Sequence, residues 1–364
     1  MSKLEELINK ICADGVKYAE LREILKIKNG SDYKGFSEGT IPVYGSGGIL
    51  AYIDRYAYNK PSVLIPRKGS IDKLYYVDTP FWNVDTIFYT EIFPDKAIPR
   101  YVYHCLLREH LEQYNTAGGV PSLTQTVLNK VKIPVPPLPV QEEIVRILDS
   151  FTELTAELTA ELTARKKQYE YYRDKLLTPT LSVPFQKLSD ICDISTGSSN
   201  TDEAVENGKY PFFVRSQEPL RKNEYEFDEE AIITAGDGVG VGKVFHHVIG
   251  KYALHQRAYR IHPNNADICG RYLYHYFISA FPKYIERQMF QGSVPSIRRP
   301  MLNSFEVPVP SLEIQNKIVQ ILDNFDSICS DLKIGLPAEI EARKKQYEFY
   351  RDKLLSFKET PTYE

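Results

Sequence analysis

The chain has 364 residues, of which 43% are hydrophobic and 26% are charged, as in ordinary globular proteins and unlike disordered or fibrous ones. Its length leaves room for two or three domains with buried cores. With 45 basic and 48 acidic residues the net charge is −3, so the chain lacks the overall basic excess of a non-specific nucleic-acid binder. It has no run of about 18 apolar residues and no apolar leader at its start, which predicts a cytoplasmic protein without membrane spans.

The first part of the chain combines short β-like runs, such as residues 62–66, with glycine-rich turns at residues 45–48 and 68–69. One aromatic-rich helix is expected near residues 100–114. A proline-rich stretch then leads into residues 141–177, which contain neither glycine nor proline. Apolar residues recur there every three or four positions, so we predict one continuous helix of roughly 55 Å.

The second part repeats this order with different turns. Residues 231–234 are β-like, glycines are dense from 236 to 242, and an aromatic-rich helix is expected near residues 271–289. Gly335 and Pro337 interrupt the last helical stretch, so we expect a break there and a new helix that begins at Pro337. Short strands mixed with a few helices predict an α+β fold in each part.

Five pairs of similar segments indicate that the chain is a duplication. Residues 164–177, ARKKQYEYYRDKLL, return at 342–355 with Phe349 in place of Tyr171 as the only change. The other pairs are residues 21–30 and 188–197, 100–104 and 271–275, 118–136 and 292–310, and 135–151 and 309–325. The middle stretches, 31–99 and 198–270, differ most. Two repeats with similar flanking segments and different middle stretches suit a protein that recognises two different sites at a fixed separation.

A helix as long as residues 141–177 with one apolar stripe needs a partner, and its second copy supplies one. We therefore expect an antiparallel two-helix coiled coil, although a core helix pair with no special use is the simpler alternative. The tetrapeptide Thr-Ala-Glu-Leu occurs at residues 155–158 and again at 159–162. Each copy adds about one helical turn, or ~6 Å, so this repeat is interpreted as an adjustable ruler, with harmless slippage as the alternative.

Catalytic motifs are not evident in the sequence. The glycine-rich run at residues 236–243 resembles a phosphate-binding loop, but Asp237 stands where a glycine is needed and Val244 where a hydroxyl side chain is needed. We interpret this run as a loop that allows close backbone approach to another molecule. No catalytic residue is therefore assigned.

Metal ligation is not expected either. The five cysteines are odd in number, scattered and without a Cys-x-x-Cys pair, which predicts a reducing compartment and no disulfide framework. The conceivable ligand groups lack the paired spacing of a zinc site; they are His246 with His247 and His255, and Cys269 with His275.

A set of polar and basic loop residues remains, suited to base edges and phosphates. Arginine and lysine bind guanine edges or phosphates, and glutamine suits adenine. Each residue alone is equally well explained as an ordinary solvated surface residue, but as a group they lie beside glycines and at matching repeat positions. The candidate DNA-binding residues are Arg67, Lys68, Ser70, Lys73, Ser122, Thr124 and Gln125 in the first repeat, and Arg215, Gln217, Lys243, Arg257, Ser296, Arg298 and Arg299 in the second.

Over essentially its whole length, the chain resembles the specificity (S, HsdS) subunit of a Type I restriction–modification system. The most specific marks are the paired segments VPPLPVQEEIVRILDSF and VPSLEIQNKIVQILDNF, the Thr-Ala-Glu-Leu repeats, and the two RKKQYE[YF]YRDKLL segments. Residues 69–77 and 80–86 also resemble target recognition domains of that family.

The resemblance implies two globular target recognition domains, separated by a long antiparallel two-helix coiled coil and related by an internal pseudo-twofold repeat. Each domain would read one half of a bipartite DNA target, and the helix pair would fix the spacer. The expected segments are target recognition domain 1 with an N-terminal helix (1–139), the central conserved helix (140–178), target recognition domain 2 (179–312), the distal conserved helix (313–358) and a polar tail (359–364).

The resemblance also implies partners: double-stranded DNA, two modification subunits that methylate adenine with S-adenosylmethionine, and two restriction or motor subunits that use ATP and Mg²⁺. The chain itself would carry no cofactor and act as a non-catalytic subunit. A helical scaffold that organises a protein assembly without reading DNA is the alternative from another class. A free-standing nuclease or methyltransferase conflicts with the missing motifs, and binding of S-adenosylmethionine by the chain alone would favour it.

Overall fold

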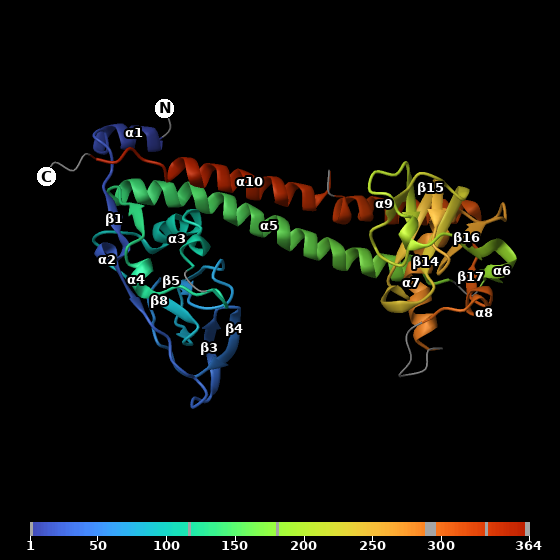
Figure 1. Cartoon of the computed structure of the whole chain (residues 1–364), viewed down its shortest axis with the longest axis horizontal. Helices are drawn as coiled ribbons and strands as arrows, with labels where there is room; N and C mark the ends of the chain where they lie inside the picture. The colour runs from blue at the N-terminus through green and yellow to red at the C-terminus, as the bar shows by residue number, and fades with distance from the viewer. Residues whose placement is uncertain (1–2, 116–117, 180–181, 288–295, 332–333, 361–364) are drawn as a thin grey trace. The chain divides into compact units, whose positions relative to one another are not determined.

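The computed structural model describes residues 3–115, 118–179, 182–287, 296–331 and 334–360 (Figure 1). The chain divides into two compact units: unit 1 comprises Met1–Leu158 and Glu339–Glu364, and unit 2 comprises Thr159–Ala338. The predicted long helix is confirmed as α5 (Leu138–Leu177), whose first half belongs to unit 1 and whose second half belongs to unit 2. Among the described residues, no helix is long and apolar enough to cross a membrane.

Unit 1 is an α+β domain built on three small sheets, with strand orders β1-β9, β2-β8-β5-β6 and β4-β3-β7. Its strands are β1 (Tyr18–Glu20), β2 (Leu25–Lys28), β3 (Glu38–Gly45), β4 (Gly48–Ile53), β5 (Ser62–Pro66), β6 (Tyr75–Val77), β7 (Trp82–Asn83), β8 (Ile87–Ile92) and β9 (Lys132–Pro134). Its helices are α1 (Lys3–Ile11), α2 (Leu21–Ile24), α3 (Pro99–Arg108), η1 (Leu111–Tyr114), α4 (Gln125–Leu128) and most of α10 (Leu336–Leu354).

Unit 2 has a six-stranded sheet in the order β11-β16-β14-β15-β12-β13, and a small β10-β17 pair. Its strands are β10 (Phe185–Lys187), β11 (Cys192–Thr196), β12 (Tyr210–Phe213), β13 (Leu220–Lys222), β14 (Phe227–Ala235), β15 (Phe245–Leu254), β16 (Ala258–Pro263) and β17 (Glu306–Pro308). Its helices are α6 (Leu188–Ile191), η2 (Thr201–Glu203), η3 (Gly238–Gly240), α7 (Gly270–Glu286), α8 (Arg299–Asn303) and α9 (Leu312–Ser330).

The predicted duplication is visible in the strand pairing. The order β2-β8-β5 of unit 1 returns as β11-β16-β14 in unit 2, and the parallel pair β3 and β7 returns as β12 and β15. The single strand β15 takes the place of both β6 and β7. Pro80 lies between these two short strands, and because proline has no N–H to donate, it does not continue a strand pairing.

A buried glutamine joins three segments at the start of each entry helix, by which we mean the first half of α5 in unit 1 and α9 in unit 2. The Gln141 amide donates to the carbonyls of Lys96 and Pro136, at 3.0 and 2.8 Å, and accepts from the Ile98 N–H at 2.9 Å. Gln315 makes the three equivalent bonds, to the backbone of Asp267, Cys269 and Pro310. Both side chains are fully buried, so each entry helix is fixed to the loop before α3 or α7.

Two turns further along each entry helix, an aspartate binds the arginine and the histidine of the repeated Arg-Tyr-x-Tyr-His segment. Asp149 accepts hydrogen bonds from Arg100 Nε at 2.8 Å and from buried His104 Nε2 at 3.0 Å. In unit 2, Asp323 contacts Arg271 at 2.8 Å and His275 at 2.7 Å in the same way. Burial lowers the pKa of both histidines.

Each entry helix also stacks an aromatic ring on the ARKKQYE helix of the other repeat. Phe151 stacks on Tyr350 in unit 1 at 5.2 Å between ring centroids, and Phe325 stacks on Tyr172 in unit 2 at 5.7 Å. These contacts within the units agree with the expected helix packing. The coiled coil along the full length of α5 stays a prediction.

The predicted strands at 62–66 and 231–234 are confirmed as β5 and as part of β14. The helix predicted at 100–114 is wrong in length, because α3 ends at Arg108 and His110 then adopts a left-handed conformation with φ of 45°. The helix predicted at 271–289 is α7, and its expected end at Met289 lies outside the described residues.

The predicted helix break near Gly335 is confirmed. α9 ends at Ser330 and α10 begins at Leu336, so Pro337 lies in the first turn, where its missing N–H costs nothing. A Cβ on Gly335 would lie 2.6 Å from the Ser327 carbonyl oxygen, which leaves room only for glycine. The new helix thus begins one residue before the expected position.

We predict that Gln141→Ala lowers the free energy of unfolding of the unit 1 transition by about 3 kcal/mol, because it leaves buried backbone groups of Lys96, Ile98 and Pro136 without partners. Urea denaturation followed by circular dichroism measures the change. The adjacent exposed Glu142→Ala is the control and should change it by less than about 0.5 kcal/mol. Equal effects of the two substitutions would contradict the role given to the glutamine.

Candidate DNA interface

In each unit four loops lie close together, and each loop has an equivalent in the other unit. Loop A is the turn after β3 with the first residues of β4 (45–50), or the connection from β12 to β13 (214–219), and loop B follows β5 or β14 (67–73 and 236–243). Loop C precedes β8 or β16 (84–86 and 255–257), and loop D leads into α4 or α8 and includes the first residue of that helix (121–125 and 296–299). The lettering is the same for both units.

Backbone hydrogen bonds bring the loops together in the same way in both units. Between loops B and C, the Arg67 N–H donates to the Thr86 carbonyl, and the Gly236 N–H donates to the Arg257 carbonyl, both at 2.8 Å. Between loops B and D, the bonds run from Leu123 to Arg67 and from Ile297 to Gly236, at 2.9 and 2.7 Å. Because Arg67 and Gly236 make the same two backbone hydrogen bonds, they are equivalent positions in the two units.

Loop A also occupies an equivalent place in both units. It follows strands that pair in parallel, Val43 with Trp82 in unit 1 and Phe212 with Ala253 in unit 2. This register aligns Ser46 with Arg215. Loop A contacts loop C in unit 1, where the Ser46 N–H donates to the Thr86 hydroxyl at 3.3 Å.

Every residue predicted from the sequence to bind DNA lies on one of these loops. In unit 1, Arg67, Lys68, Ser70 and Lys73 lie on loop B, and Ser122, Thr124 and Gln125 lie on loop D. In unit 2, Arg215 and Gln217 lie on loop A, Lys243 on loop B, Arg257 on loop C, and Ser296, Arg298 and Arg299 on loop D or at its junction with α8. The structure therefore gathers these residues in each unit, and contact with DNA stays a prediction.

The loop B cations of unit 1 are available for a ligand. Lys68 and Lys73 are exposed, and the guanidinium of half-buried Arg67 lies 5.8 Å from the centre of the Phe88 ring. Within the described part of the chain, none of the three forms an ion pair within 4.0 Å.

Two loop D residues of unit 1 also have local structural roles. The Thr124 hydroxyl accepts from the Val127 N–H at 3.3 Å and caps α4, and the Gln125 amide donates to the Asn29 side chain at 3.2 Å. A structural role therefore accompanies any contact that these two residues make with a ligand.

In unit 2, an aspartate that the sequence analysis did not assign to the site organises the cations. Arg215 contacts the Asp237 carboxylate at 2.6 Å and Arg257 contacts it at 3.4 Å. All three side chains are partly exposed, which leaves N–H groups of both guanidinium groups free for a ligand. Burial, and then the two arginines, lower the pKa of nearby His255, which favours its neutral form.

Asp237 of unit 2 stands where unit 1 has Lys68. Both form an isolated β-bridge with the serine of loop D, Lys68 with Ser122 and Asp237 with Ser296. The next residue is in each case a left-handed glycine with φ of 81°, Gly69 or Gly238. The two loops thus share one backbone shape but carry opposite charges.

One glycine of the run at 236–243 has a role within the chain, because a Cβ on Gly236 would lie 2.8 Å from the Arg257 carbonyl oxygen. Close approach of this loop to another molecule stays a prediction. Among the described residues, no three histidine, cysteine, aspartate or glutamate side chains gather as a group that could hold a metal ion.

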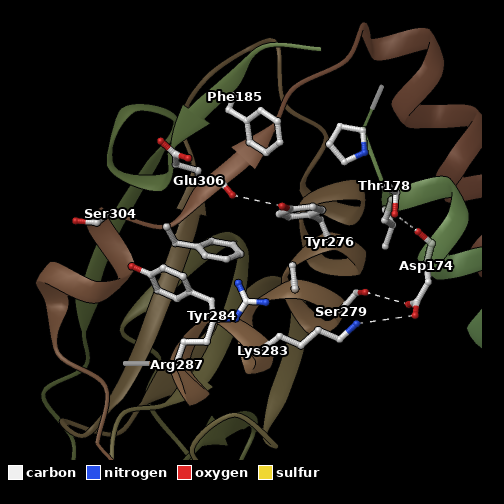
Figure 2. Close-up of a pocket in the computed structure, with 14 residues that line it drawn as sticks. Asp174, Thr178, Phe185, Tyr276, Ser279, Lys283, Tyr284, Arg287, Ser304 and Glu306 are labelled. Atoms are coloured by element: carbon white, nitrogen blue, oxygen red, sulfur yellow. Dashed lines mark hydrogen bonds and ion pairs between the residues drawn. The ribbon is translucent and has the colours of Figure 1, made fainter. Parts of the chain in front are cut away.

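A cleft of about 530 Å³ lies elsewhere on unit 2, between the end of α5, the second half of α7 and β17 (Figure 2). It is lined by two cations, Lys283 and Arg287, and by two carboxylates, Asp174 and Glu306, and Lys283 points toward Asp174 at 3.9 Å. None of the predicted DNA-binding residues lines the cleft. With balanced charges it is a poor site for a polyanion, and we do not include it in the candidate interface.

Comparison with known proteins gives the same architecture. The Type I restriction–modification specificity subunit from M. genitalium has a solved structure that matches with a TM-score of 0.67 at 16% identity, over 94% of this chain and 96% of that one. A second solved structure, from work on complex assembly and conformational transition of the type I system, matches with a TM-score of 0.57 at 16% identity, over 94% of this chain and 97% of that one. At this level of identity the likeness shows a shared fold.

Sequence comparison extends the likeness from fold to family. The specificity subunit of the Type I restriction enzyme EcoR124I/EcoR124II from Escherichia coli is 32% identical over 405 aligned positions, which cover 100% of this chain and 98% of that protein. The family model for the Type I restriction modification DNA specificity domain matches residues 13–165 and, a second time, residues 183–342. Because these two matches cover both repeats and most of the sequence, the chain belongs to the family of Type I restriction–modification specificity subunits.

Proposed function

We propose that unit 1 and unit 2 each read one half of a bipartite target in double-stranded DNA. The observation that supports this most strongly is that the same four loops recur on an equivalent frame with different side chains. A frame built twice with unlike loops suits recognition of two unlike half-sites. A scaffold that organises an assembly without reading DNA would need neither these loops nor their differences.

The side chains suggest how each unit reads bases. In unit 1, Arg67 and Lys68 would bind guanine edges or phosphates, and the Gln125 amide suits adenine. In unit 2, Asp237 would hold the guanidinium groups of Arg215 and Arg257 in a fixed plane, which favours bidentate contact with guanine. The many remaining exposed cations would hold the backbone phosphates and carry no sequence information.

We further propose that α5, together with its partner helices, sets the distance between the two half-sites. This proposal is supported by α5 itself, an unbroken helix of 40 residues that contributes to both units. An unbroken helix keeps its length, since each residue adds about 1.5 Å.

The chemistry is proposed to belong to partner subunits. Two modification subunits would bind S-adenosylmethionine and methylate one adenine in each half-site after flipping it out of the stack, and two restriction subunits would use ATP and Mg²⁺. The names of the relatives support assembly into a restriction enzyme, since the E. coli protein is a specificity subunit of one. This chain would then act as a non-catalytic subunit that directs its partners to DNA.

We predict that exchanging residues 20–134 for those of a relative changes one half-site only, because the backbone hydrogen bonds that hold loops A to D together in the described residues join segments of the same unit. Single-molecule sequencing of adenine methylation in cells measures both half-sites. The matched control exchanges residues 187–308 and should change only the other half-site. A change in both half-sites after either exchange would contradict independent reading.

Deletion of residues 159–162 should shorten the permitted spacer by about one or two base pairs, since it removes ~6 Å of helix and each base pair spans about 3.4 Å. Both half-site sequences should stay the same. Methylation of a duplex library with graded spacers measures the effect, and Glu157→Ala, an exposed change that keeps helix length, is the control. An altered half-site with an unchanged spacer would rule out the proposed ruler.

A further inference from the structure

One apolar side chain in unit 2 is exposed among charged loops. Val239 of loop B is 90% exposed and lies between Gly238 and Gly240. A charged group lies close to the preceding residue, because Arg215 Nη1 is 3.9 Å from the place that a Cβ on Gly238 would take. Full exposure of a branched apolar side chain costs free energy that binding of an apolar group would recover.

Unit 1 places its apolar side chains on a different loop. The residue equivalent to Val239 is Ser70, which follows Gly69 in the same left-handed turn. Apolar side chains appear instead on loop A, where Ile49 and Leu50 are 48% and 55% exposed. By the same strand register that makes Ser46 equivalent to Arg215, the positions equivalent to Ile49 and Leu50 in unit 2 are Glu218 and Pro219.

The two units therefore place exposed apolar side chains on different loops. Unit 1 combines an apolar loop A with a basic loop B, whereas in unit 2 loop A carries one arginine and one glutamate and loop B has an apolar tip. In the major groove, the one apolar group that a base edge presents is the 5-methyl group of thymine. A valine on a glycine-flanked turn has the size and exposure to pack against that methyl group.

We propose that Val239 contacts the 5-methyl group of a thymine in the half-site read by unit 2, and that Ile49 and Leu50 make the corresponding contact in the other half-site. The inference rests on the proposed function and adds a determinant of specificity to it. Because the apolar side chains lie on different loops, the contacted thymine is expected at a different position in each half-site.

The test replaces thymines by deoxyuridine, which removes only the methyl group. The full chain is assembled with its modification subunits, and the target sequence is first read from methylome sequencing. Each thymine of the two half-sites, on either strand, is then replaced singly in a synthetic duplex, and affinity is measured by fluorescence anisotropy. One replacement in the unit 2 half-site should weaken binding roughly fourfold, the equivalent of one buried methyl group.

Val239→Ala should weaken binding to the unmodified duplex by a similar factor and abolish the further effect of that one replacement. The control is Ile249→Ala, which also shortens an exposed branched apolar side chain to alanine, at a position that is 76% exposed on β15, and it should leave the deoxyuridine effect intact. A half-site without thymine, or a deoxyuridine effect that persists in Val239→Ala, would overturn the inference. The proposed function fails separately, if methylome sequencing detects no bipartite target at all.

Discussion

The fold depends on the buried polar contacts that each entry helix makes with the domain before it. Gln141 and Asp149, or Gln315 and Asp323, lie eight residues apart and therefore close to one face of the helix. The glutamine binds backbone groups before and after α3 or α7, and the aspartate binds the arginine and histidine on that helix. Since a buried polar group without a partner is costly, these contacts specify one orientation of the helix within its own unit.

This arrangement separates the parts of the chain that must stay constant from those that can vary. The contacts use residues at the proline-rich exits and on α3 or α7, and none of them involves loops A to D. A substitution such as Lys68 for Asp237 therefore changes the charge of loop B without disturbing the frame. The shared left-handed glycines Gly69 and Gly238 preserve the backbone shape while the neighbouring side chains differ.

Much of this frame could be predicted because its signals are local. The buried run at 62–66, the helix at 141–177 and the break at Gly335 each follow from composition within a few residues. The end of α3 could not, because a histidine in a left-handed conformation at position 110 leaves no clear trace in the sequence.

The candidate site was predictable in part for the same reason. Basic residues beside glycines identify loop B, and the matching Ser122 and Ser296 identify loop D. The equivalence of Ser46 with Arg215 depends on parallel pairing between strands about forty residues apart, which no local pattern encodes. A pattern of basic residues does not indicate Asp237, because it is an acid that acts by orienting Arg215, although it is the one charged side chain between Gly236 and Gly242.

The Thr-Ala-Glu-Leu repeat lies between the part of α5 that packs in unit 1 and the part that packs in unit 2. Residues 155–162 lie beyond the contacts of Asp149 and Phe151 in unit 1 and before Tyr169 and Tyr172, which contact Phe325 in unit 2. Most side chains of the repeat are exposed and none is fully buried, so adding or removing one turn there removes no fully buried side chain. A change in helix length and a change in loop sequence therefore act on different residues, which is what independent evolution of spacer and half-site requires.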